Sequence, residues 1–120
     1  MPPVVAGAAW WVEKLGQWLP TTDGVRNGNR RLHAVGAGVR YRDETDELLI
    51  ETIDAPLVAI GGPALLEFRN DLPQADQGIH INLYNNVWGT NFPQWYDDDA
   101  RFRVVCRLNT GIGRPRPGRQ

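Results

Sequence analysis

The dominant pattern along the chain is an alternation of apolar and polar residues with a period of two, which is typical of half-buried β-strands. The alternation is clearest at 101–108 and 32–42, and it recurs at 79–84. Each of these stretches therefore predicts one strand. In the stretch 101–108, the residues predicted to point inward are Phe102, Val104, Cys106 and Leu108.

More continuous apolar runs predict three further strands, at 48–53, 57–60 and 64–68. The segments Asp54-Ala55-Pro56 and Gly61-Gly62-Pro63 separate them. Proline cannot donate a ladder hydrogen bond, and it restricts the residue before it, so both segments end a strand.

The tryptophan-rich stretch 10–19 fits two elements. The spacing of four residues is helical: Trp11, Leu15, Trp18 and Leu19. Gly16 in the middle and the aromatic, β-branched start instead favour two short strands joined by a tight turn. We favour the hairpin.

Together these elements predict an all-β fold, an antiparallel β-sandwich of roughly six to eight short strands with at most one short helix. The 13 glycines and 9 prolines are spread along the chain, as expected for many tight turns. We expect a flexible N-terminal arm at 1–9, a single domain at 10–109 and a disordered Gly/Pro/Arg tail at 110–120. The predicted core consists of Val35, Val39, Ile50, Ile53, Leu57, Ile79, Ile81, Leu83, Phe102, Val104 and Leu108.

Composition narrows the class of protein. A chain of 120 residues forms one domain, and a net charge of −1 provides no field for nucleic acid or a membrane surface. A single cysteine excludes an internal disulfide, and no apolar run approaches the roughly 20 residues of a membrane span. The first residues make a poor signal peptide. We expect a soluble, cytoplasmic protein.

Catalytic chemistry has little support in the residues. The chain contains no serine, and neither His33 nor His80 has a second histidine or a cysteine at metal-ligand spacing. Cys106 is expected to be inert, because it points inward from a predicted strand. Asp54 is the acidic residue least typical of a turn, and a structural role fits it best. We predict no metal and no cofactor.

The stretch 78–96 is the exception, because it holds more aromatic and amide groups than a turn requires. Flat aromatic rings suit the apolar face of a sugar, and amide or imidazole groups suit its hydroxyls. The structural alternative is that the tryptophans fill the core and the amides bond to backbone. The candidate carbohydrate-binding residues are His80, Asn82, Tyr84, Asn85, Asn86, Trp88, Asn91, Trp95 and Tyr96.

Three motifs carry a resemblance to a known family: GNRRLHAV at 28–35, IDAPLV at 53–58 and LYNNVWGTNFPQWY at 83–96. They resemble the C-terminal region of an uncharacterised microbial family similar to family 38 glycoside hydrolases, the α-mannosidase group. The resemblance implies a β-sandwich that lies behind a catalytic barrel. It covers nearly the whole chain, but the catalytic aspartate and metal ligands of that barrel have no counterpart here.

The resemblance therefore implies a non-catalytic accessory domain, whether a fragment, a split gene product or a remnant, that supports a missing catalytic barrel and lines its carbohydrate site. Two alternatives stay open: a small stand-alone glycosidase that uses Asp54 or an acid from 97–99, and a protein-interaction module that uses the aromatic loop. The expected partners are a catalytic barrel, a carbohydrate and a second copy of the chain. We expect self-association through the apolar surface of Trp10, Trp11 and Trp18.

Overall fold

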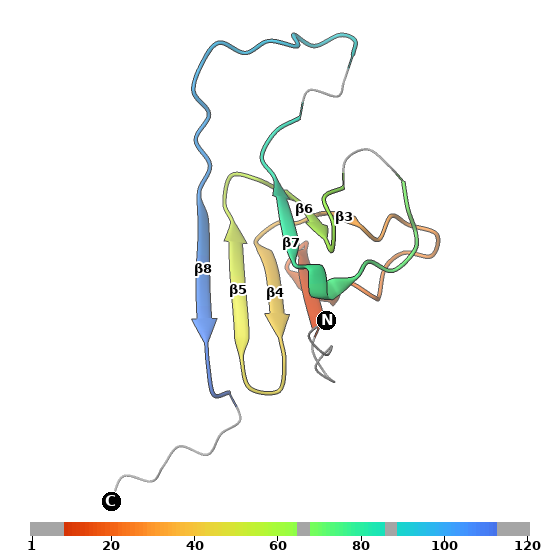
Figure 1. Cartoon of the computed structure of the whole chain (residues 1–120), viewed down its shortest axis with the longest axis vertical. Coiled ribbons are helices and arrows are strands. Elements are labelled where there is room, and N and C mark those ends of the chain that lie inside the picture. Colours follow the sequence, from red (N-terminus) through yellow and green to blue (C-terminus); the bar gives the residue numbers. More distant parts are fainter. Residues whose placement is uncertain (1–8, 65–67, 86–88, 113–120) are drawn as a thin grey trace, which may run out of the picture.

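The computed structural model describes residues 9–64, 68–85 and 89–112, and within these residues the chain forms eight strands in two antiparallel sheets (Figure 1). This confirms the predicted all-β class. The five-stranded sheet has the order β2-β1-β4-β5-β8, and the three-stranded sheet has the order β3-β6-β7. The strands are β1 (Ala9–Lys14), β2 (Gln17–Pro20), β3 (Leu32–Ala34), β4 (Gly38–Arg42), β5 (Glu47–Thr52), β6 (Leu57–Ile60), β7 (Ile79–Asn82) and β8 (Val104–Asn109). One 3-10 turn, η1 (Ala75–Gln77), precedes β7.

The stretch 10–19 forms the predicted hairpin, with β1 paired to β2. Its turn consists of Leu15 and Gly16, which both have a positive φ (53° and 83°). This conformation matches the twist of a two-residue hairpin, and glycine adopts it without steric cost. The hairpin reading is therefore correct and the helical one is not.

The predicted single strand at 32–42 is wrong, because the chain leaves one sheet and enters the other between β3 and β4. The carboxylate of Glu13 accepts hydrogen bonds from the backbone amides of Gly16 and Ala37. A Cβ at Gly36 would collide with that carboxylate. The close approach of the Glu13 carboxylate to the backbone turns the chain at 35–37, although the apolar alternation of the sequence continues through these residues.

The core lies between the two sheets. Trp10 packs against Tyr41 at a ring distance of 5.1 Å, and its indole Nε1 donates to the Ala75 carbonyl oxygen at 3.0 Å, which ties η1 over β1. Other side chains of the cluster come from both sheets. The fully buried members are Val12, Val39, Val58 and Ile60.

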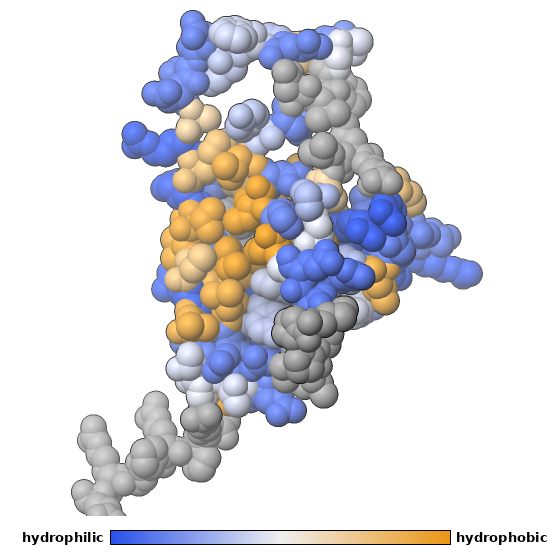
Figure 2. Space-filling model, viewed as in Figure 1, coloured by the Kyte–Doolittle hydropathy of each residue, from blue (hydrophilic) through white to orange (hydrophobic). Residues whose placement is uncertain are grey.

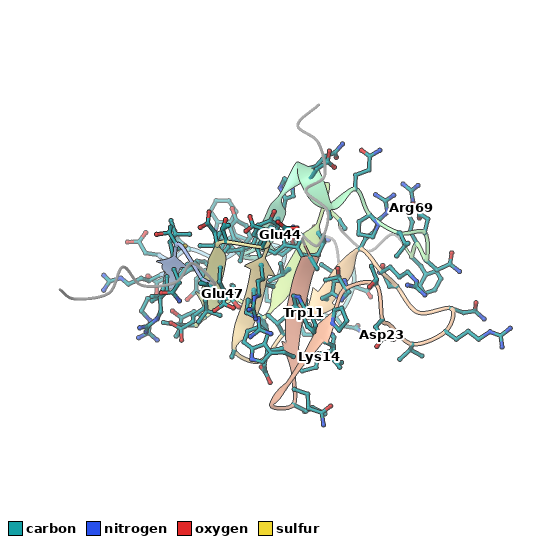
Figure 3. All side chains as sticks on the ribbon, turned by 90° about the horizontal axis from the view of Figure 1, so that it is seen from below. Trp11, Lys14, Asp23, Glu44, Glu47 and Arg69 are labelled. Carbon is teal, nitrogen blue, oxygen red and sulfur yellow. The ribbon has the colours of Figure 1, made fainter. Side chains whose placement is uncertain are left out.

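The tryptophan hairpin is not the exposed apolar surface expected from the sequence. Trp10 belongs to the core and is only 8% exposed. Trp11 and Trp18 are half-buried, and the Arg40 guanidinium lies over both rings, at 5.5 and 4.9 Å from their centroids. Cation–π stacking of this kind accounts for aromatic rings on an outer sheet face. Figure 3 labels Trp11 and Lys14, which both come from the first strand of this hairpin.

Four residues of the predicted core are exposed instead: Ile53, Leu83, Val104 and Leu108. Cys106, also expected to be buried, is exposed. The reason is the small size of the second sheet. Its three strands lie over β1 and β4, and they leave β8 uncovered on the same side of the large sheet (Figure 1).

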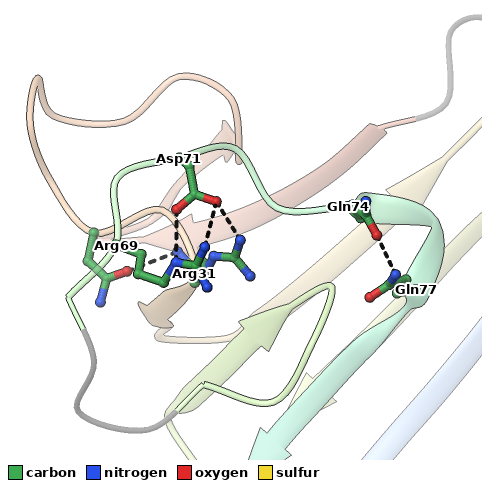
Figure 4. Close-up of polar contacts among 6 residues, drawn as sticks. Arg31, Arg69, Asp71, Gln74 and Gln77 are labelled. Carbon is green, nitrogen blue, oxygen red and sulfur yellow. Dashed lines mark hydrogen bonds and ion pairs between the residues drawn. The ribbon is translucent and has the colours of Figure 1, made fainter.

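The loop before η1 is attached to the segment before β3 by an ionic cluster (Figure 4). Asp71 accepts a hydrogen bond from Arg69 Nε at 3.1 Å and another from Arg31. The Arg30 amide also donates to the Arg69 carbonyl oxygen, at 3.0 Å.

The predicted strand at 64–68 is not present in its described residues, since Ala64 and Phe68 lie outside any strand and 65–67 fall outside the description. The expected arm at 1–9 and tail at 110–120 also fall outside it, apart from Ala9 and 110–112. Ala9 begins β1, and the Ile112 amide donates to the Thr45 carbonyl oxygen at 2.7 Å.

Candidate functional site

The chain between β7 and β8, here called the aromatic arm (residues 83–103), carries most of the aromatic side chains that are exposed among the described residues. It runs beyond the ends of the strands before it returns as β8 (Figure 1). The exposed fractions are 81% for Tyr84, 68% for Phe92, 77% for Trp95 and 74% for Tyr96. Monomeric proteins rarely expose so many large apolar side chains together, and such groups mark interaction sites. The arm is therefore the first candidate for a binding surface.

An open hollow of about 660 Å³ lies within the aromatic arm. This volume is in the range of small-molecule sites. Aromatic, amide and carboxylate side chains all contribute to its wall. The lining residues are Leu83, Tyr84, Asn85, Pro93, Gln94, Trp95, Tyr96, Asp98, Asp99, Ala100 and Phe102.

Four of the nine sequence-predicted site residues meet in this hollow: Tyr84, Asn85, Trp95 and Tyr96. They come from the two ends of the arm, so the fold brings together residues that lie about ten positions apart. Asn91 lies on the arm with a positive φ of 67° and is not part of the lining. Asn86 and Trp88 lie outside the described residues.

The two remaining candidates, His80 and Asn82, bond to backbone instead. His80 Nε2 lies 3.1 Å from the Gly61 carbonyl oxygen, and Asn82 Nδ2 donates to the Ala64 carbonyl oxygen at 3.0 Å. Both contacts attach β7 to the segment that follows β6. These side chains therefore hold the start of the arm in place, whereas Tyr84 and the residues beyond it reach the hollow.

Three polar lining residues are not among the carbohydrate-binding candidates: Gln94, Asp98 and Asp99. The sequence offers the two aspartates only as acids for the alternative of a stand-alone glycosidase. The aspartates look like an acidic turn in the sequence, because three of them stand in a row at 97–99. Their closeness in sequence to Trp95 and Tyr96 is the signal that could have included them.

Asp54, the acid considered for catalysis, is engaged in a structural ion pair. Its carboxylate accepts hydrogen bonds from Arg103, and this contact lowers the pKa of Asp54 below its usual value. A carboxyl group with a lowered pKa is ionised at neutral pH, so it cannot serve as a general acid there. Asp54 also does not line the hollow.

Among the described residues, no group of three His, Cys, Asp or Glu side chains is placed so that it could hold a metal ion. The arrangement offers stacking surfaces together with hydrogen-bond acceptors. Exposed rings can cover an apolar ligand face, and the two aspartate carboxylates can accept bonds from hydroxyl groups. The hollow is thus suited to a polar ligand with one apolar face.

No helix in the described part of the chain has the length and apolar character needed to cross a membrane.

A scan against protein-family models finds no match for the chain, and searches of curated proteins and of solved structures also find none. These comparisons do not link the chain to family 38 glycoside hydrolases, so the resemblance of the three sequence motifs stays a hypothesis.

Proposed function

We propose that this chain is a non-catalytic β domain that binds carbohydrate in the hollow of its aromatic arm. The observation that carries the proposal is the joint placement of exposed rings and acidic side chains around one hollow. Tyr84, Trp95 and Tyr96 supply the rings, and Asp98 and Asp99 supply the carboxylates.

The chemistry of a pyranose explains why this combination fits. One face of the ring carries C–H groups, which stack on an aromatic side chain, while the hydroxyls at its edge donate to carboxylate or amide oxygens. Trp95 is 77% exposed, so its ring is available for stacking without unfolding any part of the core. The two sheets serve as the scaffold that holds the ends of the arm.

We further propose that the natural setting of the domain is a glycoside-hydrolase-like protein related to the α-mannosidase group. The motif at 83–96 that suggests this family is also the segment that supplies much of the hollow. Because the hollow is open, a catalytic barrel placed against the arm would complete its wall. In this arrangement the domain positions a sugar and the barrel cleaves it.

The direct test is a titration of the full chain with mannose and mannose oligosaccharides, followed by the NMR signals of the tryptophan indole groups. We expect saturable shifts of the Trp95 indole signal. Trp95→Ala should abolish binding, followed in that variant by the ring signals of Tyr84 and Tyr96, and Phe92→Ala should leave the Trp95 shifts intact, because Phe92 is an exposed aromatic of the same arm outside the hollow. Absence of saturable shifts at millimolar oligosaccharide would contradict the proposal.

The alternative of a small stand-alone glycosidase has one supporting observation, the presence of Asp98 and Asp99 in the hollow. Glycoside hydrolysis requires two carboxyl groups across the scissile bond. Release of the aryl group from aryl-mannosides by the purified chain, lost in both Asp98→Asn and Asp99→Asn, would establish this alternative. We expect no release.

A further inference from the structure

Strand β8 is the last strand of the five-stranded sheet, and no other described strand lies along its outer edge. Hydrogen bonding in an antiparallel ladder alternates, so every second residue turns its N–H and C=O toward a given neighbour. Ile53 donates to the Arg103 carbonyl oxygen at 3.2 Å, and the same register makes Val105 and Arg107 the residues bonded to β5. The intervening residues therefore direct their backbone groups to the open edge. These residues are Val104, Cys106 and Leu108.

The side chains of the same three residues form an uncovered apolar strip. They pair with Thr52, Ile50 and Leu48 of β5, so they lie on the side of the large sheet that faces the core. Val104 is nevertheless 40% exposed and Leu108 is 64% exposed. Figure 2 shows hydrophobic residues gathered over β5 and β8, to the side of the smaller sheet. The open edge thus combines unpaired backbone groups with exposed apolar side chains.

A second copy of β8 can pair with this edge in antiparallel orientation. Three registers of the two strands give a long overlap, and only one of them sets compatible side chains opposite each other. Centring the pair on Val105 places Arg103 opposite the partner's Arg107, and centring it on Arg107 places two copies of Arg107 opposite each other. Like charges directly opposite are destabilising. Centring the pair on Cys106 places Val104 opposite the partner's Leu108 and Arg107 opposite the partner's Val105. This register pairs apolar with apolar and sets no arginine against another.

We propose that two copies of this chain associate through β8, antiparallel and centred on Cys106, so that their large sheets join into one. In this dimer the Cys106 N–H of each copy donates to the Cys106 carbonyl oxygen of the other. On either side, Val104 of one copy and Leu108 of the other exchange a pair of backbone hydrogen bonds. The apolar strips of both copies then lie side by side across the two-fold axis.

The charges of β8 are compatible with this pairing. Charged side chains commonly protect an edge strand from association. Here, however, Arg103 is paired with Asp54 at 2.8 Å and Arg107 with Glu51 at 3.0 Å, both within one chain. The register centred on Cys106 leaves both of these ion pairs in place and sets neither arginine opposite another. This interface goes beyond the proposed sugar site, and its test requires no carbohydrate.

The test combines sedimentation equilibrium of the full chain at micromolar to submillimolar concentration with amide hydrogen exchange. We expect a monomer–dimer equilibrium in which the outward amides of Val104, Cys106 and Leu108 gain protection as the concentration rises. The amides of Val105 and Arg107 are the internal control, because they bond to β5 and should be protected at every concentration.

Cys106→Pro removes an outward N–H and no donor to β5, because the N–H of residue 106 points away from β5. We expect it to raise the dimer dissociation constant about tenfold or more, because the two central bonds, one from each copy, are lost. Cys106→Val is the matched control, which keeps the N–H and should still form the dimer. If Cys106→Pro fails to fold, the exchange data of the parent chain decide.

Three results would overturn the proposal. The first is a monomer at all concentrations. The second is a dimer whose outward β8 amides exchange freely, which would assign association to another surface. The third is concentration-independent protection of those amides, which would show that the chain covers its own edge.

Discussion

The carboxylate of Asp54 holds both the backbone amide and the side chain of Arg103, a residue 49 positions further along the chain. Its Oδ2 accepts from the Arg103 amide at 2.9 Å and from Nε at 2.8 Å, and its Oδ1 accepts from Nη2 at 2.9 Å. Asp54 follows β5, and Arg103 precedes β8. The contact therefore fixes the point where the aromatic arm rejoins the large sheet.

This contact predicts a stability loss at acid pH. Hydrogen bonds from Arg103 lower the pKa of Asp54, so the folded state binds its proton less readily than the unfolded chain does. The stabilisation is complete above the unfolded pKa, about 3.9, and it is lost as the pH falls through the lower folded pKa. Asp54→Asn should reduce the melting temperature at pH 7, and its difference from the parent should shrink below about pH 4.

The control for this prediction is Asp23→Asn, which removes the same charge from an exposed loop position. It should melt close to the parent at both pH values. A melting difference between parent and Asp54→Asn that stays constant from pH 7 to pH 3 would contradict a role for the ionised carboxylate.

A second pH effect is expected from His33, which is buried in β3. Burial lowers the pKa of His33, the nearby charge of Lys14 adds to this effect, and the contact of Nε2 with the Arg30 carbonyl oxygen, at 3.1 Å, opposes it. Because the folded pKa is depressed, the stabilisation is present above the unfolded pKa, about 6.5, and is lost as the pH falls through the folded value. Thermal melts should therefore show a decrease between pH 7 and pH 5 that His33→Gln lacks. An equal decrease in both proteins would assign it to other groups.

The sequence predicts the strands better than it predicts the layers. The alternation at 101–108 correctly places Val104 and Leu108 on the same side of a sheet as Val39 and Ile50. Alternation reports which side of a sheet a residue lies on, but not whether a second sheet extends far enough to cover it. Val39 and Ile50 lie under the smaller sheet and are buried, whereas Val104 and Leu108 lie beyond it.

The same limit applies to the chain turn at 35–37 and to the hollow. Apolar alternation continues through Val35, so the local signal that β3 and β4 belong to different sheets is limited to Gly36 and Gly38. The decisive contact is with Glu13, more than 20 positions earlier. In the hollow, the aromatic character of Trp95 indicates a binding residue, whereas the run of aspartates around Asp98 indicates a turn. Its position in the hollow wall depends on the path of the whole arm.

Gly38 is predicted to be intolerant of any side chain. It begins β4 with a φ of 150°, and a Cβ there would collide with the carbonyl oxygen of Ile50 on the neighbouring strand. Gly38→Ala should lower the free energy of unfolding by about 2 kcal/mol or more, through backbone strain and overpacking. Gly24→Ala is the control, because its Cβ would meet open space, and it should be neutral or slightly stabilising. Urea unfolding of both variants would measure the difference, and equal midpoints would contradict the prediction.

The two tryptophans Trp10 and Trp95 should respond oppositely to truncation. Trp10 is 8% exposed, packs on Tyr41 and donates to the Ala75 carbonyl oxygen, so Trp10→Ala removes a core ring together with its hydrogen bond to η1. This should cost about 3–5 kcal/mol of unfolding free energy. Trp95 is 77% exposed on the aromatic arm, and Trp95→Ala should change the unfolding free energy by less than about 0.5 kcal/mol.

Comparing the two variants distinguishes a binding residue from a structural one, because an exposed ring that contacts only a ligand contributes little to the free energy of folding. Urea unfolding monitored by far-ultraviolet circular dichroism measures both variants without relying on tryptophan emission. A strongly destabilised Trp95→Ala would show that the ring supports the arm from within, and it would remove the stacking surface on which the sugar site depends. A Trp95→Ala variant that folds like the parent and no longer responds to mannose oligosaccharides would instead assign the ring to the ligand.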